Sequence, residues 1–260
     1  MTKPAGVDRR RWLQRALALA GGLALSACDR VAQSDRVNST LDVAEGWTQH
    51  VQRLLLGRQA LAREYSESDI SEEFRANGTT NPDTDEYNHL AQDHFANWRL
   101  TVGGLVQRPL SLSLADLRRM PARTQITRHD CVEGWSCIGK WTGTRLSALL
   151  NLVQVKPGAK YLAFYCADTL ELALDGTGQY YESIDLIDAM HPQTILAYDM
   201  NDRPLPVAHG APLRLRLERQ LGYKMAKYIM RIDAIENFSG LGRGKGGYWE
   251  DRGYQWYAGI

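Results

Sequence analysis

The sequence predicts a single folded domain of the mixed α+β class, on three observations. Its 260 residues carry 31 Lys and Arg against 30 Asp and Glu, with 44% hydrophobic residues, as in an ordinary globular domain. Short apolar segments with strand and helix periods follow one another from Trp98 to Ile235. No repeat or linker interrupts them, so we expect mixed sheets with short helices around one core.

The same composition argues against several classes of protein. A formal net charge of +1 gives no indication of nucleic-acid binding. Four Cys are too few for a disulfide-stabilised scaffold. Balanced charge and aperiodic Gly and Pro argue against disorder, collagen and coiled coil, and no apolar run approaches the roughly 20 residues of a membrane span.

The first 27 residues have the layout of an export signal. Basic residues between Lys3 and Arg15 precede an Ala- and Gly-rich apolar stretch at 16–27. The run RRRWL at 9–13 resembles a twin-arginine signal, and LSAC at 25–28 resembles a bacterial lipoprotein box. We therefore expect removal of residues 1–27 and lipidation of Cys28. The alternatives are cleavage without lipid and a basic amphipathic helix that is retained.

The charge balance agrees with cleavage before Cys28. Residues 1–27 hold five basic residues and one acidic residue, so the remainder of the chain carries a net charge of −3. The twin-arginine route that this segment resembles exports folded proteins, as is needed when a cofactor is inserted in the cytoplasm. We therefore expect a periplasmic cofactor enzyme, tethered to the inner membrane through lipid on Cys28.

Between the export signal and the first strand, the pattern predicts a tether and one helix. Residues 29–40 are polar without an apolar period, whereas apolar residues recur at near-helical spacing from Asp42 to Tyr65. Residues 66–91 are polar and rich in turn-forming pairs, which predicts a loop. We place the tether and N-terminal helix at 28–68 and the folded domain at 69–260.

Within the folded domain, alternation of apolar and polar residues predicts strands at 98–102 and 213–217. The segment 161–166 is predicted to be a buried strand, and 125–130, 194–198 and 228–235 are also predicted to be extended. Short helices are predicted from a Ser113 capping box to Met120, from Leu146 to Val153, and from a Ser183 cap to Met190. In the strand at 213–217, Arg214 and Arg216 alternate with Leu, which on its own favours a solvated strand face.

The segment 128–137 holds the densest group of reactive residue types. Cys131 follows a predicted strand and precedes an acid, a Gly and a Trp, hence it lies in a loop, where functional groups concentrate. Its thiol is compatible with a nucleophile, a metal ligand, half of a disulfide with Cys137, or an inert core group. The spacing to Cys137 disfavours structural zinc, and the chain contains no Cys-x-x-Cys-His haem motif.

Three blocks resemble the sulfite oxidase superfamily, near the branch that contains the periplasmic methionine sulfoxide reductases. RHDCVEGWS at 128–136 resembles the molybdenum-ligand loop, HGAPLR at 209–214 resembles the pterin-contacting His-Gly-x-Pro-x-Arg, and GYKMAK at 222–227 resembles the phosphate-holding Gly-x-Lys-x-x-Lys. The resemblance spans about residues 70–240. It implies a sulfite-oxidase-type molybdopterin-binding fold and a molybdenum–molybdopterin cofactor.

The resemblance also implies roles for single residues. Cys131 becomes the catalytic protein ligand of molybdenum, a soft metal that favours thiolate. The cofactor-binding residues that it implies are His209, Arg214, Lys224, Met225, Ala226 and Lys227. Arg and Lys supply the rigid fork and the point charges that suit a phosphate. The family's remaining pterin contacts fall on Asp69, Glu72, Glu73 and Cys166, of which only Glu73 keeps the family's residue type.

The activity implied by the resemblance is two-electron oxo-transfer to or from a small molecule. The reductase branch favours reduction of an S-oxide or N-oxide, and the alternative is oxidation of sulfite, for which Arg75 and Arg128 are the candidate anion-binding residues. The chain holds no haem or iron–sulfur motif, so we expect a separate electron-transfer partner, a membrane haem protein or a periplasmic cytochrome. The family's additional dimerisation domain is missing after about residue 240, so we expect a monomer.

Two alternatives belong to other classes of protein. One is a cofactor-free thiol–disulfide protein that uses Cys131 and Cys137. The other is a non-catalytic lipoprotein that binds a partner through its C-terminal tail, which is rich in Gly, Tyr and Trp after residue 240. For the tail aromatics, ordinary packing is favoured over a roof above the site.

Overall fold

The computed structural model describes residues 34, 46–48, 50–54, 57, 59–171 and 178–260. The predicted export signal, the lipoprotein box and almost all of the predicted tether therefore lie outside the described residues. The chain divides into two compact units, residues 1–52 and 53–260. In the first unit, residues 46–48 and 50–52 are helical, as their spacing predicts. No helix within the described ranges is long and apolar enough to cross a membrane.

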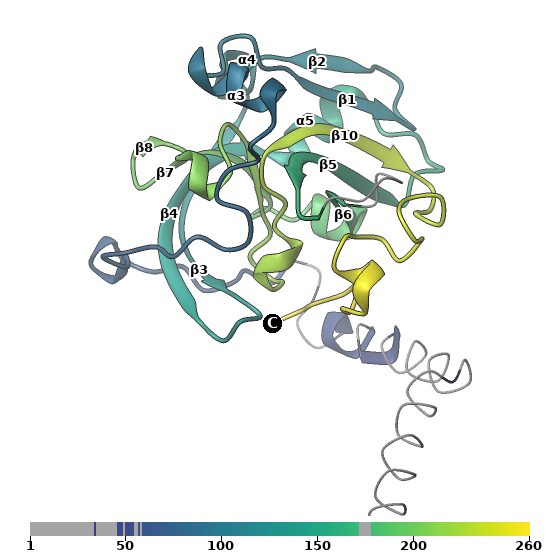
Figure 1. The fold of residues 1–260 in the computed structure, drawn as a ribbon. Coiled ribbons are helices and arrows are strands. Elements are labelled where there is room, and N and C mark those ends of the chain that lie inside the picture. The colour runs from purple at the N-terminus through teal and green to yellow at the C-terminus, as the bar shows by residue number, and fades with distance from the viewer. Residues whose placement is uncertain (1–33, 35–45, 49, 55–56, 58, 172–177) are drawn as a thin grey trace, which may run out of the picture. The chain divides into compact units, whose positions relative to one another are not determined.

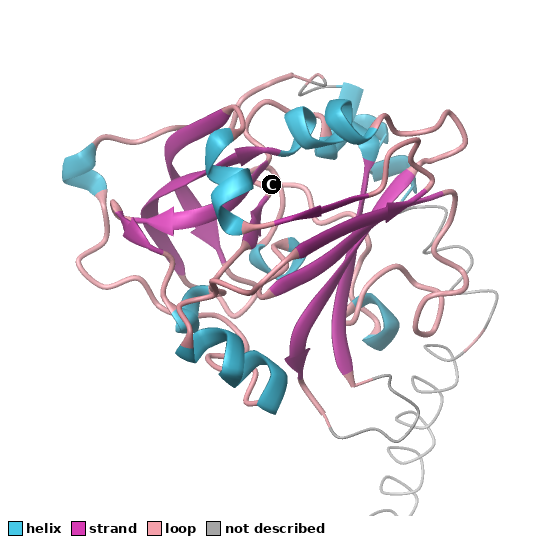
Figure 2. Cartoon of the chain, turned by 90° about the horizontal axis from the view of Figure 1, so that it is seen from above, coloured by secondary structure: helices cyan, strands magenta, loops and turns pink. Residues whose placement is uncertain are grey.

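The second unit contains two sheets, which lie side by side in Figures 1 and 2. The first sheet has the strand order β2-β1-β10-β5-β6. Its strands are β1 (Leu100–Gly104), β2 (Leu110–Leu112), β5 (Tyr161–Thr169), β6 (Gln179–Asp185) and β10 (Ile229–Ile235). β1 and β10 are parallel and the other neighbours antiparallel, so the beginning and the end of the core share one sheet.

The second sheet is built on one long hairpin. Its strands are β3 (Ala122–Asp130), β4 (Ser136–Arg145), β7 (Ile195–Met200), β8 (Arg203–Pro204) and β9 (Arg214–Arg216). β3 and β4 pair from Ala122↔Thr144 to Asp130↔Ser136, β7 pairs with β4, and both β8 and β9 pair with β7. This register leaves residues 131–135 as the tip of the hairpin and thereby fixes the position of Cys131.

The helices are short. The α-helices are α3 (Asp85–Gln92), α4 (Leu114–Arg119), α5 (Leu146–Val153) and α6 (Leu186–Ala189). Single turns of 3-10 helix are η1 (Glu67–Asp69), η2 (Val207–His209), η3 (Gly222–Lys224) and η4 (Glu250–Arg252). α4 begins with the predicted capping box, in which the Ser113 amide donates to Asp116 at 2.9 Å and the Asp116 amide donates to the Ser113 hydroxyl at 3.1 Å.

The main apolar core joins both sheets. It gathers buried side chains from β1, β5, β6 and β10, from β7 and β9, and from one face of α5. Each fully buried Leu or Ile stabilises the fold by roughly 1.5–3 kcal/mol relative to an exposed one. A smaller cluster on the second sheet contains Phe74, Trp141, Ile195, Ala197, Met200 and Leu205. These contacts hold the hairpin against the rest of the domain.

The mixed α+β class is confirmed, and so are the helices after Ser113 and Leu146 and the six predicted strands, with small changes in their bounds. The predicted helix at 42–65 is wrong beyond residue 54 in the described ranges, because Gly57 has φ of +67° and Glu64 forms a bridge with Thr127. The sequence patterns missed α3 and the strands β2, β4, β6 and β8.

Two further expectations are wrong. Ser183 lies inside β6 rather than at a helix cap, and the cap of α6 is Asp185, whose carboxylate accepts from the Asp188 amide at 2.9 Å. Arg214 and Arg216 do not form a solvated face, because both side chains are 0% exposed. Both faces of β9 are therefore buried, and neither faces water.

Candidate active site

Cys131 opens the tight turn at the tip of the β3–β4 hairpin. Its amide donates to the Trp135 carbonyl at 2.9 Å, and the Gly134 amide donates to the Cys131 carbonyl at 3.0 Å. Gly134 has φ of +87°, a conformation that glycine adopts without a steric penalty. The turn holds the thiol half-buried. Burial raises the pKa of Cys131, and a hydrogen bond from the backbone N–H of Glu133 partly offsets this rise.

The Cys131 side chain lines a cavity of 110 Å³. The lining is made by Asn77, Gly78, Thr79, Cys131, Val132, Glu133, Asp168, Leu170, Tyr180, Tyr223, Met225, Lys227, Trp249 and Tyr254. The cavity therefore brings Cys131 together with Met225 and Lys227, which follow it by more than 90 residues in the sequence. The remaining predicted cofactor-binding residues do not line this cavity.

Arg214 is a buried cation that pairs with no carboxylate among the residues the structure describes. Its side chain is 0% exposed, and one Nη donates to the His209 carbonyl at 2.9 Å. Its Nε and second Nη are buried and have no partner among the described atoms. Burial, followed by the charge of Arg216, lowers the pKa of Arg214 to about 9. An uncompensated buried guanidinium is costly, so this position suits an anion that the protein itself does not supply.

Gly210 permits the close approach of Arg214 and Lys227. Its φ is +106°, and a Cβ at this position would lie 2.8 Å from the Lys227 Cβ and 3.3 Å from the Arg214 Cβ. Beside it, His209 carries a buried Nδ1 without a partner. Burial and the charge of Arg214 lower the pKa of His209 to about 4, so its imidazole is neutral at physiological pH.

In the described part of the chain, the hydrogen-bond partners of the Lys227 ammonium are carbonyl oxygens. Its Nζ donates to Asn77 at 2.6 Å, to Thr79, and to Ala208 at 3.3 Å. Burial, followed by Arg214, lowers the pKa of Lys227 to about 7. Asp168 lines the same cavity with a buried Oδ1 that has no partner, and burial raises the pKa of Asp168 to about 6.

The neighbouring Arg216 has a different environment from Arg214. It is also 0% exposed, but its Nη2 lies 2.6 Å from Glu218 and its Nη1 donates to His129 Nδ1 at 3.0 Å. Burial, followed by Arg216, lowers the pKa of His129 well below its ordinary value. Since Nδ1 accepts, the proton of this neutral His lies on Nε2, which has no partner.

Lys224 forms a buried ion triad. Its side chain is 0% exposed, its Nζ lies 2.5 Å from Glu250, and it also pairs with Glu182. Both carboxylates are themselves buried. The Lys224 ammonium is therefore committed to protein carboxylates, while the adjacent Met225 lines the cavity. Ala226 is fully buried, and its carbonyl accepts from the Leu215 amide at 2.8 Å.

The four remaining predicted contacts are not gathered in the cavity. Asp69, Glu72 and Glu73 are exposed. The Asp69 carboxylate accepts from the amide of Ser66, the residue before η1, at 2.9 Å. Cys166 is 0% exposed within β5, where it belongs to the apolar core. Burial raises the pKa of Cys166 well above its ordinary value.

The three described cysteines are free thiols, and Cys137 contacts the Glu73 carbonyl at 3.8 Å rather than Cys131. Within the described ranges, no three His, Cys, Asp or Glu side chains gather into a metal site. A metal at Cys131 would therefore need ligands from outside the described residues. This arrangement agrees with a metal held by one protein sulfur and an organic cofactor.

Unpartnered polar atoms concentrate around one aromatic ring. Phe74 lies with its ring centroid 5.6 Å from His209, 5.9 Å from His129 and 5.3 Å from Trp141. Within the described ranges, His209 Nδ1, His129 Nε2 and Trp141 Nε1 are all buried without hydrogen-bond partners. The same holds for two nitrogens of Arg214, whose guanidinium lies 5.0 Å from the centroid of the Trp141 ring. Such orphaned groups are rare in folded proteins, and their chemistry fits an anionic planar cofactor with many hydrogen-bonding edges.

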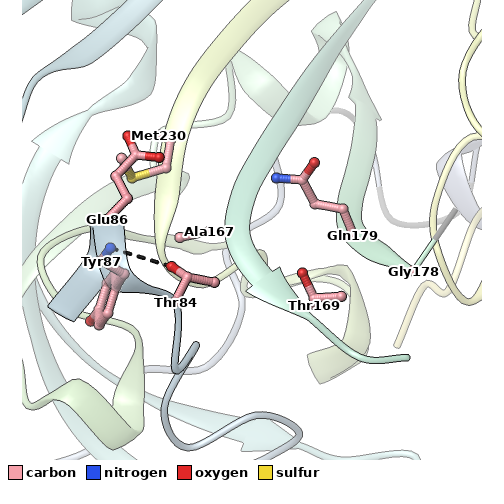
Figure 3. A pocket seen from close by; sticks show the side chains of 8 residues that line it. All are labelled: Thr84, Glu86, Tyr87, Ala167, Thr169, Gly178, Gln179 and Met230. Carbon is pink, nitrogen blue, oxygen red and sulfur yellow. Dashed lines mark hydrogen bonds between the residues drawn. The ribbon is translucent and has the colours of Figure 1, made fainter. Parts of the chain in front are cut away.

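A larger cleft of 440 Å³ lies elsewhere, between α3, β5, β6 and β10 (Figure 3). It is lined by Thr84, Glu86, Tyr87, Ala167, Thr169, Gly178, Gln179 and Met230. These residues supply one carboxylate but no thiol, imidazole or cation, and the bond drawn in Figure 3 is the cap of α3, from the Tyr87 amide to the Thr84 hydroxyl at 3.3 Å. The cavity at Cys131 is therefore the candidate active site.

Sequence reasoning missed several members of this cavity. Asp168 follows the predicted strand in an apolar context that gives no indication of a site, and Asn77 to Thr79 were assigned only to a loop. Trp249 and Tyr254 were assigned to packing, but both line the cavity. These segments lie far from Cys131 in the sequence, and the fold brings them to the same cavity.

The chain is a molybdopterin-dependent oxidoreductase by its family. A family model described as "Oxidoreductase molybdopterin binding domain" matches residues 87–240, and the chain belongs to this family. The protein is therefore an enzyme that uses a molybdenum–molybdopterin cofactor, as the sequence resemblance implies.

Named relatives agree with the family. The chain is 38% identical over 251 residues to the putative protein-methionine-sulfoxide reductase subunit YedZ1 of Azospira oryzae, covering 96% of this chain and 87% of that protein. It is 32% identical over 154 residues to the protein-methionine-sulfoxide reductase catalytic subunit MsrP of Campylobacter jejuni, covering 55% and 51%. The MsrP of Xanthomonas axonopodis is 38% identical over 148 residues, covering 54% and 45%. The chain thus spans about half the length of these MsrP proteins.

Among solved structures, the sulfane dehydrogenase SoxCD from Paracoccus pantotrophus is similar with a TM-score of 0.48 and 25% identity. The match covers 55% of this chain and 39% of that one.

Proposed function

We propose that this enzyme reduces an S-oxide to the corresponding thioether. The observation that carries the proposal is the lining of the Cys131 cavity, which combines aromatic and aliphatic side chains with one Lys, two carboxyl groups and no Arg. A neutral S-oxide with apolar substituents matches this lining. The relatives described above are named as methionine-sulfoxide reductases, which supports the same reaction.

Oxidation of sulfite fits the cavity less well. An anionic substrate needs convergent cations, yet Glu133 and Asp168 both line the cavity and would repel it. The two predicted anion-binding residues lie outside this lining. Arg75 lies 5.3 Å from the Trp135 ring, and Arg128 is half exposed and pairs with Asp130 at 2.8 Å.

The residues divide the work between holding the cofactor and receiving the substrate. Cys131 supplies the protein sulfur for molybdenum, and Arg214, His209, Lys227, Met225 and Ala226 form the cradle for the pterin and its phosphate. When bound, the cofactor supplies the two-electron oxygen-atom chemistry. Lys224 holds the backbone of this segment in place through Glu182 and Glu250 rather than by contacting phosphate with its ammonium.

The reaction consumes two electrons and two protons for each S-oxide. The S–O bond breaks, sulfur is reduced to a thioether, and the oxygen leaves as water. Asp168 lines the cavity with a pKa of about 6, so its carboxyl group can hold a proton near that pH. The electrons come from a separate protein, for which a membrane haem protein or a periplasmic cytochrome is the expected class.

The proposal includes the location of the enzyme. Residues 1–27 serve as a twin-arginine signal, Cys28 carries the lipid, and a tether and helix at 28–68 connect it to the catalytic domain at 69–260. The enzyme then works as a monomer in the periplasm, at the inner membrane. This layout rests on the sequence patterns at 9–13 and 25–28.

The test is a substrate panel with cofactor-loaded enzyme. With reduced benzyl viologen as electron donor, we expect turnover of methionine sulfoxide and methyl phenyl sulfoxide, and less turnover of trimethylamine N-oxide. Sulfite oxidation, followed with ferricyanide, should be slow or undetectable. Rapid sulfite oxidation without S-oxide reduction would contradict the proposal.

Two Ser variants test the role of Cys131. Cys131→Ser is expected to abolish turnover while the domain stays folded, because the hydroxyl replaces the soft sulfur ligand. Cys137→Ser is the matched control, since its thiol lies outside the cavity and contacts the Glu73 carbonyl. Equal activity of both variants would refute the assignment of Cys131.

A further inference from the structure

The C-terminal tail, residues 241–260, lies outside the matched family domain but forms part of the cavity at Cys131. Trp249 and Tyr254 from the tail line this cavity together with Tyr223. The ring centroids of Tyr223 and Tyr254 are 5.1 Å apart in an edge-on arrangement, and those of Trp249 and Tyr254 are 5.3 Å apart and stacked. The three rings therefore form one continuous wall.

Hydrogen bonds and an ion pair anchor this wall of three rings (Tyr223, Trp249 and Tyr254) to the rest of the domain. Glu250, next to Trp249, forms a buried ion pair with Lys224 at 2.5 Å. The Tyr223 hydroxyl donates to the Gln255 carbonyl at 2.6 Å, and the Tyr254 amide donates to the Trp249 carbonyl at 3.0 Å. Both tail rings are thus held in place before a substrate arrives, which lowers the entropy cost of binding.

The mouth of the cavity presents apolar side chains to solvent. Val132, which follows Cys131, is 46% exposed, and Tyr254 is 38% exposed. Both line the cavity, so the hairpin tip and the tail each contribute an apolar group to its rim. Exposed apolar groups gathered around a cavity are typical of a surface that a ligand covers.

We propose that Trp249 and Tyr254 determine specificity by packing against the apolar substituent of the S-oxide. This inference rests on the proposed S-oxide reduction and names the part of the substrate that the tail selects. Aromatic faces contact aryl rings and thioether sulfur favourably, whereas a small, hydrated S-oxide gains little from them. The tail thereby favours aryl and long-chain S-oxides over dimethyl sulfoxide.

The test compares two S-oxides on the full chain loaded with cofactor. The ratio of kcat/KM for methyl phenyl sulfoxide to that for dimethyl sulfoxide is measured for the wild type, Trp249→Ala and Tyr254→Ala. We expect the ratio to fall about tenfold in Trp249→Ala, through KM more than kcat, because the lost wall contacts only the larger substituent. Trp249→Phe should keep most of the ratio.

Phe238→Ala is the matched control. It also removes an aromatic ring, but one that packs against Tyr161 and Trp256, with centroids at 4.9 and 5.7 Å, and does not line the cavity. Its ratio should equal that of the wild type. An unchanged ratio in both tail variants, or an equal fall in Phe238→Ala, would overturn the proposal.

Two further measurements separate the possible failures. Calorimetric binding of thioanisole, the product sulfide, should weaken in Trp249→Ala about tenfold, whether or not the wild type reduces S-oxides. If the wild type reduces neither substrate, the proposed function fails while the binding result still decides the role of the wall. If Trp249→Ala loses molybdenum, the wall holds the cofactor and the specificity proposal is wrong.

Discussion

Arg214 donates one hydrogen bond to the carbonyl oxygen of His209 at 2.9 Å, and its remaining buried nitrogens have no partner among the described atoms. Arg216, two residues later and equally buried, is neutralised by Glu218 at 2.6 Å. The same strand therefore presents one compensated and one uncompensated guanidinium. This difference supports the proposal that Arg214 binds the cofactor, because an isolated buried charge is otherwise destabilising.

The first prediction concerns Arg214→Met. In the cofactor-free protein, the substitution should raise the free energy of unfolding by on the order of 1–4 kcal/mol, because it removes an uncompensated buried charge. It should also reduce the molybdenum content of protein made in molybdate-supplemented cells. Metal analysis and denaturant unfolding measure the two effects.

Arg216→Met is the contrasting variant. It leaves Glu218 buried without its cation and should therefore lower the free energy of unfolding by about 3–5 kcal/mol. If Arg214→Met destabilised the cofactor-free protein as much as Arg216→Met does, Arg214 would be a structural residue and its assignment to the cofactor would be wrong.

The second prediction concerns the ion triad of Lys224. Lys224→Met leaves Glu182 and Glu250 buried beside each other without a cation, and should cost about 3–5 kcal/mol in the free energy of unfolding. Glu250→Gln should cost less, because Lys224 keeps Glu182 as its partner. Urea unfolding of cofactor-free protein measures both.

Lys140 offers a matched surface control. It also contacts two carboxylates, Glu67 at 2.7 Å and Asp202 at 2.9 Å, but both of these acids are about 70% exposed. Lys140→Met should therefore cost less than about 1 kcal/mol. Similar costs for Lys224→Met and Lys140→Met would show that burial does not strengthen the triad.

Local patterns in the sequence were enough for the elements that depend on local chemistry. The helix at 146–153 has a four-residue apolar face, and the Ser113 capping box is complete within four residues. The prediction for Ser183 is wrong because Ser is a common cap residue, and here the cap lies two residues later, at Asp185. Its position in a buried strand is decided by contacts with β5 and Trp256, which are distant in the sequence.

Only those residues of the candidate site that belong to a recognisable sequence motif were predictable. Cys131, Arg214 and Lys227 lie in recognisable blocks, but the burial of Arg214 comes from both faces of β9 being covered. Sequence alternation cannot distinguish that case from a solvated face. Asp168 and Trp249 carry no motif, and their place in the cavity follows from the sheet topology and from the anchored tail.

The third prediction concerns export and rests on the sequence alone. Arg9→Lys combined with Arg10→Lys should keep the protein in the cytoplasm, because the paired arginines are the feature that the twin-arginine route reads. Cys28→Ser should still be exported but should be released from the membrane fraction, since it lacks the thiol that carries lipid. Cell fractionation with an antibody to the protein measures both. Normal export of the double Lys variant would show that another route is used.

The fourth prediction concerns the pH dependence set by Asp168. Burial raises the pKa of Asp168 from 3.8 to about 6, opposed by a hydrogen bond from Thr79 and by the charge of Lys227. The folded state therefore favours the protonated carboxyl, and its stability falls as the pH rises from about 4 to about 6. A shift of this size lowers the free energy of unfolding by about 3 kcal/mol above pH 6, compared with its value below pH 4.

Asp168→Asn cannot ionise, so the cofactor-free variant should match the wild type near pH 4 and exceed its free energy of unfolding at pH 7.5. The lost attraction for Lys227 reduces this gain. Urea unfolding at both pH values measures the difference, and a gap that does not change with pH would show that Asp168 is not the titrating group.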